Sequence, residues 1–178
     1  MKLNLMRHIG TGTPKAERAL GPGYGLNVTV VYEDAPTRQW AGQVCQRVER
    51  LVGKEGARIT WWRLADLSEP AVLAGAVSKA IRADVILVAT QSFEVFPLPF
   101  YVWISSWVPH RFHGPGALVA LVATPETCNG RANRDRRFQY LRSVARQGQL
   151  DFLVEERPPR KTARRPRRSR SEEMLAAA

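Results

Sequence analysis

The chain has 178 residues, 44% of them hydrophobic and 24% charged, which is enough for one domain with a real core. Its net charge of +11 suggests nucleic-acid binding, but residues 157–178 hold eight Lys/Arg against two Glu and so carry +6 of it. The rest, with nineteen against fourteen, carries only +5, which argues against a strongly basic fold. We therefore predict an N-terminal arm (1–22), an α/β domain (23–156) and a disordered basic tail (157–178).

Alternating segments of strand and helix character follow one another along the chain. Strands are predicted at 26–32, 58–64, 85–89, 117–124 and 151–155, and helices at 36–52, 69–82, 100–108 and 131–147. Asp34 is expected to cap the first helix, with Pro36 in its first turn, and Ser68 to cap the second. Gly53 and Gly56 are expected to close the first helix.

The third strand is predicted to be the central strand of the sheet, because residues 85–89 are all apolar and do not alternate with polar residues. Such a run is typical of a strand that is buried on both faces of a parallel sheet. Five strands alternating with four helices predict a doubly wound, flavodoxin-like α/β fold with strand order 2-1-3-4-5. That fold ends in a fifth helix, but here the fifth strand runs into RPPRKTARRPRRSR, in which prolines and like charges oppose a helix.

Two further features of the chain concern its compartment. Cys45 and Cys128 lie far apart, no metal-ligand spacing includes them, and no secretory signal precedes them. These observations predict a reduced, cytoplasmic protein. Pro97 and Pro99 interrupt the apolar stretch 85–109, which argues against a membrane span.

The missing last helix and the aromatic third helix both predict self-association. One sheet face should lie partly bare beside the first helix. Phe100, Trp103 and Trp107 form part of an apolar arc that is too wide for one buried stripe, so we expect them at an interface. A homodimer is the predicted assembly.

Ligands of doubly wound sheets bind beyond the carboxyl ends of the strands. Three loops are expected to meet there, at 33–38, 90–99 and 124–130. The candidate ligand-binding residues in or beside them are Thr37, Arg38, Thr90, Gln91, Ser92, Thr124 and Arg131.

The sequence ADVILVAT, a proline-containing loop, a helix ending in Trp107, and GALVALVAT resemble the corresponding half of NADPH-dependent FMN reductases. The resemblance covers residues 83–124 and, more loosely, the first strand and helix. It implies a flavodoxin-like fold that binds FMN and passes electrons from a nicotinamide.

Two loops differ from the pattern of that family. The family's flavin loop carries glycine and asparagine, whereas residues 91–96 contain neither. The first loop carries Glu33 and Asp34, whose charges repel a phosphate. Asp34 has a second interpretation as an ordinary helix cap, which we favour.

The acids Glu33 and Asp34 also resemble the Mg²⁺-binding acids of two-component receiver domains. That resemblance implies an acceptor aspartate at the end of the third strand, where this chain has Thr90 and Gln91. It also implies a lysine at the end of the fifth strand, where this chain has Glu155 and Glu156. Thr124 matches the receiver's hydroxyl position, so a receiver-like module without phosphotransfer is implied.

The fourth helix is rich in arginine. We interpret Arg142 and Arg146 as a solvated face, and keep Arg131 and Arg134, at the start of the helix, as candidates to contact a phosphate. His110 and His113 have no third ligand nearby and are interpreted as loop residues.

These observations support three functional hypotheses. The first is a non-catalytic flavodoxin-like or receiver-like interaction module that acts through protein contacts, without a cofactor. The second is an FMN-dependent NAD(P)H oxidoreductase with atypical flavin loops. The third is a nucleic-acid accessory protein that binds nucleic acid or an anionic surface through residues 157–170.

Overall fold

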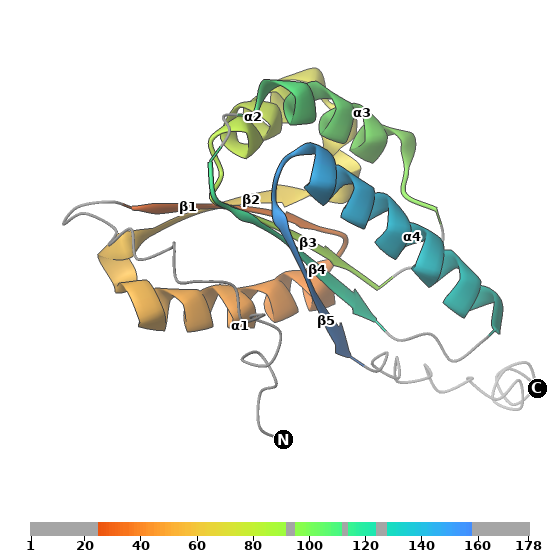
Figure 1. Cartoon of the computed structure of the whole chain (residues 1–178), viewed down its shortest axis with the longest axis horizontal. Helices are drawn as coiled ribbons and strands as arrows, with labels where there is room; N and C mark the ends of the chain where they lie inside the picture. Colours follow the sequence, from red (N-terminus) through yellow and green to blue (C-terminus); the bar gives the residue numbers. More distant parts are fainter. Residues whose placement is uncertain (1–24, 92–94, 112–113, 124–127, 158–178) are drawn as a thin grey trace, which may run out of the picture.

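The computed structural model describes residues 25–91, 95–111, 114–123 and 128–157 (Figure 1). The arm at 1–22 and almost all of the tail at 157–178 lie outside the described residues, as do Ser92, Thr124 and His113. The strands are β1 (Leu26–Tyr32), β2 (Ala57–Arg63), β3 (Val85–Thr90), β4 (Ala117–Ala123) and β5 (Asp151–Arg157). The α-helices are α1 (Ala35–Val52), α2 (Pro70–Ile81), α3 (Leu98–Trp107) and α4 (Cys128–Gln147), and the 3₁₀ helices are η1 (Lys54–Gly56), η2 (Leu64–Ser68) and η3 (Val108–His110).

The five strands form one parallel sheet in the order β2-β1-β3-β4-β5, which confirms the predicted arrangement. Helix α1 lies on one face of this sheet, and α2, α3 and α4 lie on the other (Figure 1). The strands run in the same direction, so their carboxyl ends share one edge, to which α1 and α3 present their first turns. Of the three predicted ligand loops, residues 33–38 and the described part of 90–99 lie at this edge, whereas residues 124–127 lie outside the described residues.

Strand β3 has the two-sided burial that its unbroken apolar run predicts. Ile86 and Val88 belong to the core cluster beneath α2, α3 and α4, whereas Leu87 and Ala89 belong to the cluster beneath α1. All four side chains are at most 1% exposed. Successive side chains of a strand point to opposite faces, so a central strand covered on both faces is apolar at every position.

Ser68 does not cap α2, and that prediction is wrong. Residue 68 ends the 3₁₀ helix η2, where its hydroxyl donates to the carbonyl of Ala65 at 3.0 Å. The N-cap of α2 is Glu69, which makes no side-chain capping bond. The extra turn buries Leu64 and Leu67 against the core, a gain that the local capping pattern does not reveal.

The expectation that Phe100, Trp103 and Trp107 form an exposed interface is also wrong. Each of these side chains is 0% exposed within a single chain. They belong to the cluster that α2, α3, α4, β3 and β4 build together. The aromatic side of helix α3 therefore packs into the core of the single chain, while Leu98 and Val102 of the same helix stay exposed.

Strand β5 ends at Arg157, the last described residue, so the predicted absence of a last helix lies outside the described residues. The place beside α1 is bridged by side chains of β5. The carboxylate of Glu155 accepts from the Trp40 indole at 3.0 Å and from Arg47 at 2.6 Å, and Arg157 donates to Gln43 at 2.8 Å. Leu153 of the same strand remains 49% exposed, so part of the apolar face stays open.

Within the described part of the chain, no helix is both long enough and apolar enough to cross a bilayer.

Candidate functional site

The carboxyl edge of the sheet brings together the end of β1, the start of α1 and the end of β3. The N-terminus of α1 is closed by a capping box, in which the Thr37 amide donates to the Asp34 carboxylate at 2.9 Å and the Asp34 amide donates to the Thr37 hydroxyl at 2.8 Å. Asp34 is thus the helix cap that the sequence favours.

The Thr37 hydroxyl uses its full hydrogen-bonding capacity inside this box. It accepts from the amides of Glu33 and Asp34, at 3.1 and 2.8 Å, and donates to an Asp34 carboxylate oxygen at 2.7 Å. A hydroxyl has one hydrogen to donate and two lone pairs, so none is left for a ligand. Thr37 is also 0% exposed.

Glu33 joins the first loop to the end of β3. Its amide donates to the carbonyl of Ala89 at 3.1 Å, and its carboxylate accepts from the amide of Gln91 at 2.9 Å. The Gln91 amide, which could otherwise face a ligand, is therefore occupied by an acid of the protein itself. A negative charge held at this position opposes a phosphate or an anionic flavin ring.

Thr90 ends β3 in a buried position and contacts a buried arginine. The Arg137 guanidinium donates to the Thr90 hydroxyl at 3.2 Å and lies over the ring of Phe96, 4.3 Å from its centroid. Thr90 is 2% exposed and Arg137 5%. The hydroxyl of Thr90 and the charge of Arg137 thus hold the β3–α3 connection against α4.

Arg137 is one of the arginines of the fourth helix that could bind an anion, but the sequence interpretation missed that its side chain is buried. Its position, four residues before Leu141 and seven before Val144, places it on the buried stripe of α4 rather than on the solvated face. That spacing was visible in the sequence, but an arginine on an apolar stripe is ordinarily assigned to the surface.

Arg38 contacts aromatic rings instead of the centre of this edge. Its guanidinium lies 5.8 Å from the centroid of Tyr32 and 5.6 Å from that of Trp61. Both distances are within the range of cation–π contacts. Arg38 therefore lies toward the β2 side of the sheet.

For the candidates Ser92, Thr124 and Arg131 the structure describes no side chain. Ser92 and Thr124 lie outside the described residues, and Arg131 belongs to the first part of α4, where the structure describes the helix but not this side chain. In the described part of the chain, no group of three or more His, Cys, Asp or Glu side chains is placed to hold a metal ion. The acids Glu33 and Asp34 are instead engaged in the contacts given above.

Beside the edge lies an aromatic cluster formed by Phe96, Phe100, Tyr101 and Tyr140. The rings of Tyr101 and Tyr140 meet edge to face with centroids 5.0 Å apart. Burial, followed by the proximity of Tyr101, raises the pKa of Tyr140 to about 12. The Tyr140 phenol therefore stays neutral at physiological pH and serves as packing.

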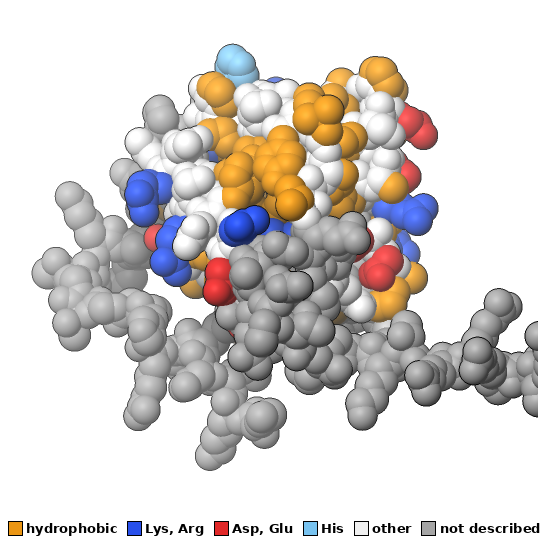
Figure 2. Space-filling view, turned by 90° about the vertical axis from the view of Figure 1, so that its right-hand side faces the viewer, with side chains coloured by type: hydrophobic (Ala, Val, Ile, Leu, Met, Phe, Trp, Pro, Cys, Tyr) orange, Lys and Arg blue, Asp and Glu red, His pale blue; other side chains and the backbone are white. Residues whose placement is uncertain are grey.

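The surface of this edge is partly apolar. Figure 2 views the side of the molecule toward which the carboxyl ends of the strands point in Figure 1, and hydrophobic side chains gather in the middle of that face. Near this edge the exposed large apolar residues are Val95, Leu98 and Val102, with exposed fractions of 65%, 74% and 40%. Leu98 and Val102 are four residues apart in α3 and so share one helix face.

Comparison with known proteins gives a structural likeness only. No family model and no curated protein matches the sequence. An oxidoreductase from Corynebacterium diphtheriae has a similar solved structure, with a TM-score of 0.51, 16% identity, and coverage of 72% of this chain and 78% of that one. Together with the strand order, this places the fold. The chain has a flavodoxin-like fold.

Two further flavodoxin-like matches are weaker. A candidate quinone reductase from Klebsiella pneumoniae has a TM-score of 0.45, with 14% identity and coverage of 78% of each chain. The flavodiiron core of a Synechocystis protein has a TM-score of 0.42, with 14% identity and coverage of 78% of this chain and 32% of that one.

The fold family implies FMN, so its fit to the described residues matters. In such sheets a phosphate is held by free backbone amides and hydroxyls at the first strand–helix turn. In this chain the amides of Glu33, Asp34 and Thr37 and the hydroxyl of Thr37 all bond within the protein. The described residues of this turn do not fit an FMN phosphate.

Proposed function

We propose that this chain is a non-catalytic, flavodoxin-like interaction module that acts through protein contacts. The observation that carries the proposal is the closure of the first turn, where the Thr37 hydroxyl is saturated by Glu33 and Asp34. Opening this turn for a phosphate requires breaking the capping box of α1, which costs about 1 kcal/mol. It also requires moving a phosphate toward two carboxylates.

The same edge supports protein contact. Val95 and Leu98 are 65% and 74% exposed near the carboxyl ends of the strands, where doubly wound sheets bind their ligands. Exposed apolar groups gathered on one face favour association with another protein surface. The predicted homodimer is part of this proposal, with contacts from this face in place of the buried Phe100, Trp103 and Trp107.

A visible spectrum and a thermal melt test the proposal. The purified full chain is expected to be colourless, and added FMN is expected to leave its melting temperature unchanged. A ligand that binds only the native state raises the melting temperature by mass action. Flavin absorbance in the purified protein, or a saturable shift with micromolar FMN, would contradict the proposal.

The rival candidate is an FMN-dependent NAD(P)H oxidoreductase with atypical flavin loops. The likeness to the Corynebacterium diphtheriae oxidoreductase favours it, at 16% identity. In this reading the flavin is held mainly by segments other than the first turn. The FMN titration separates the two candidates directly. A cytoplasmic location and a nucleic-acid role for residues 157–170 remain predictions from the sequence.

A further inference from the structure

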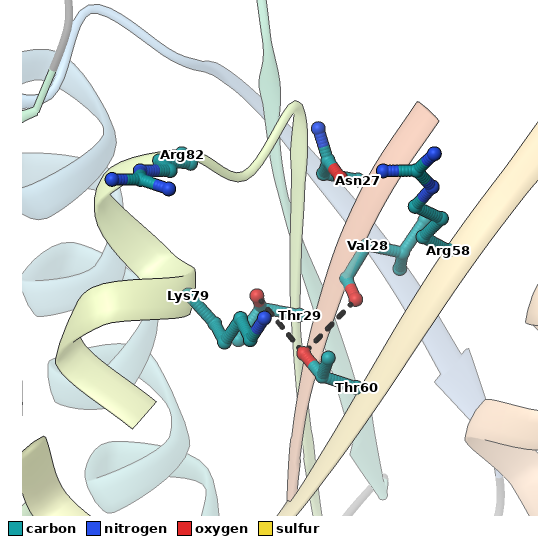
Figure 3. Close-up of a pocket in the computed structure, with 7 residues that line it drawn as sticks. All are labelled: Asn27, Val28, Thr29, Arg58, Thr60, Lys79 and Arg82. Carbon is teal, nitrogen blue, oxygen red and sulfur yellow. Dashed lines mark hydrogen bonds between the residues drawn. The ribbon is translucent and has the colours of Figure 1, made fainter. Parts of the chain in front are cut away.

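A polar pocket lies at the opposite edge of the sheet, where β1 and β2 begin and α2 ends. Its volume is about 340 Å³. The lining residues, drawn in Figure 3, are Asn27, Val28, Thr29, Arg58, Thr60, Lys79 and Arg82. Asn27 pairs with Arg58 and Thr29 with Thr60 in the register of β1 and β2, so these four side chains share the sheet face beneath α2.

Three cations from two elements line this pocket, and no carboxylate of the described residues does. Arg58 comes from β2, whereas Lys79 and Arg82 come from the end of α2. In Figure 3 the Lys79 side chain extends toward the two threonines, while Arg58 and Arg82 stand on opposite sides. None of the three forms an ion pair with a carboxylate of the described residues.

The floor of the pocket consists of hydroxyl groups that are only weakly engaged. The Thr29 and Thr60 oxygens are 3.4 Å apart, and the Thr60 hydroxyl is 3.4 Å from the Val28 carbonyl oxygen. Good hydroxyl hydrogen bonds are shorter, at about 2.7–2.8 Å. Thr29 is only 2% exposed, so this loosely bonded hydroxyl is buried at the bottom of a cationic pocket.

The helix dipole accounts for only part of this arrangement. Cations at a helix C-terminus are stabilised by the helix dipole, which gives Lys79 and Arg82 an ordinary structural role. Arg58 is on a strand and has no such role. Asp84, whose carboxylate accepts from the backbone amide of Asn27 at 2.7 Å, is not among the residues that line the pocket.

We propose that this pocket binds the diphosphate group of a small molecule. Guanidinium, ammonium and hydroxyl donors are the groups that bind phosphate oxygens in proteins, and three positive charges match a multiply charged anion. The volume equals that of on the order of ten waters, which is more than one phosphate fills and suits a diphosphate with part of its ester. The site is independent of the proposed function, because it lies at the other end of the strands.

Calorimetric titration of the full chain with sodium pyrophosphate at low ionic strength tests the proposal. Saturable binding at one site is expected. Lys79→Gln and Arg58→Gln are each expected to weaken it about tenfold, the scale of one charge-assisted hydrogen bond. Thr60→Val should weaken binding without changing the charge of the chain. Circular dichroism melts check that each variant remains folded.

Arg50→Gln is the matched control, because Arg50 in the last turn of α1 is the counterpart of Lys79 in the last turn of α2. It should change the affinity less than twofold. If Arg50→Gln weakens binding as much as Lys79→Gln does, or if Lys79→Gln leaves binding unchanged, pyrophosphate binds by general charge attraction and not in this pocket. Either result would contradict the proposal. Absence of saturable binding would do the same. If binding of a single-stranded oligonucleotide depends on Lys79 while pyrophosphate binding does not, the small-molecule assignment is wrong.

Discussion

The indole nitrogen of Trp40 donates to the carboxylate of Glu155 at 3.0 Å, which joins α1 to the last strand across 115 positions of sequence. Arg47 reaches the same carboxylate at 2.6 Å, and Arg157 lies over the Trp40 ring at 4.9 Å from its centroid. These contacts connect α1 and β5 on the sheet face that the sequence predicts to be partly bare. Polar groups thus cover part of that face.

Trp40→Phe is expected to lower the free energy of unfolding by about 1 kcal/mol, because it removes one hydrogen bond to a partly buried carboxylate. Urea denaturation measures this difference. Trp61→Phe is the control, since Trp61 packs against the same core cluster as Trp40, although it is only half-buried, and its indole nitrogen donates no hydrogen bond to a described residue. An equal loss in both variants would show that ring size, and not the bond to Glu155, sets the cost.

Leu98→Asp is expected to shift the chain from dimer to monomer in sedimentation experiments at micromolar concentration. A charge on the apolar face at the start of α3 must be desolvated when that face is covered by a second chain. Leu51→Asp is the control, because Leu51 is 84% exposed at the end of α1, comparable with 74% for Leu98. A monomeric intact chain, or equal dissociation by both variants, would remove the predicted dimer face.

Gly116→Ala is expected to destabilise the fold by about 1–3 kcal/mol, the usual cost of forcing extra volume into a packed site. An added Cβ would lie 2.7 Å from the Asp84 carbonyl oxygen and 2.8 Å from a Leu150 methyl, and would meet the Arg111 guanidinium. At Gly114 the same atom would meet no atom of the described residues within 4 Å. Thermal melts should therefore separate Gly116→Ala from Gly114→Ala, and similar melting temperatures would contradict this packing.

The buried thiol of Cys45 is expected to lower the free energy of unfolding at alkaline pH. Burial, followed by the charge of Glu49, raises the pKa of its thiol from 9.0 to about 11. Between these values the unfolded chain has released this proton while the native chain keeps it, so the contribution of Cys45 to stability falls as pH rises from 9 to 11. Urea denaturation across this range should show a steeper fall for the natural chain than for Cys45→Ala. Parallel profiles would show that other groups cause the fall.

Local patterns in the sequence were enough to predict the elements and their order. The unbroken run of β3, the Asp34 cap with Pro36 in the first turn, and Gly53 at the end of α1 each depend on neighbours within one turn or strand. Backbone sterics and capping chemistry act at this range, so they can be read from adjacent residues. The parallel order then follows from the alternation of strands and helices.

Only the tertiary structure decided which polar groups are already bonded and which aromatic groups are covered. The Thr37 hydroxyl is saturated only because the backbone of the first turn brings the amides of Glu33 and Asp34 to it. Trp103 is buried only because residues of α2 and α4 pack into the same cluster. The pocket around Lys79 and Arg58 depends on the register of β1 with β2 and on where α2 ends. Such contacts join residues far apart in the chain, and their energies depend on packing and dielectric surroundings that one-dimensional patterns do not carry.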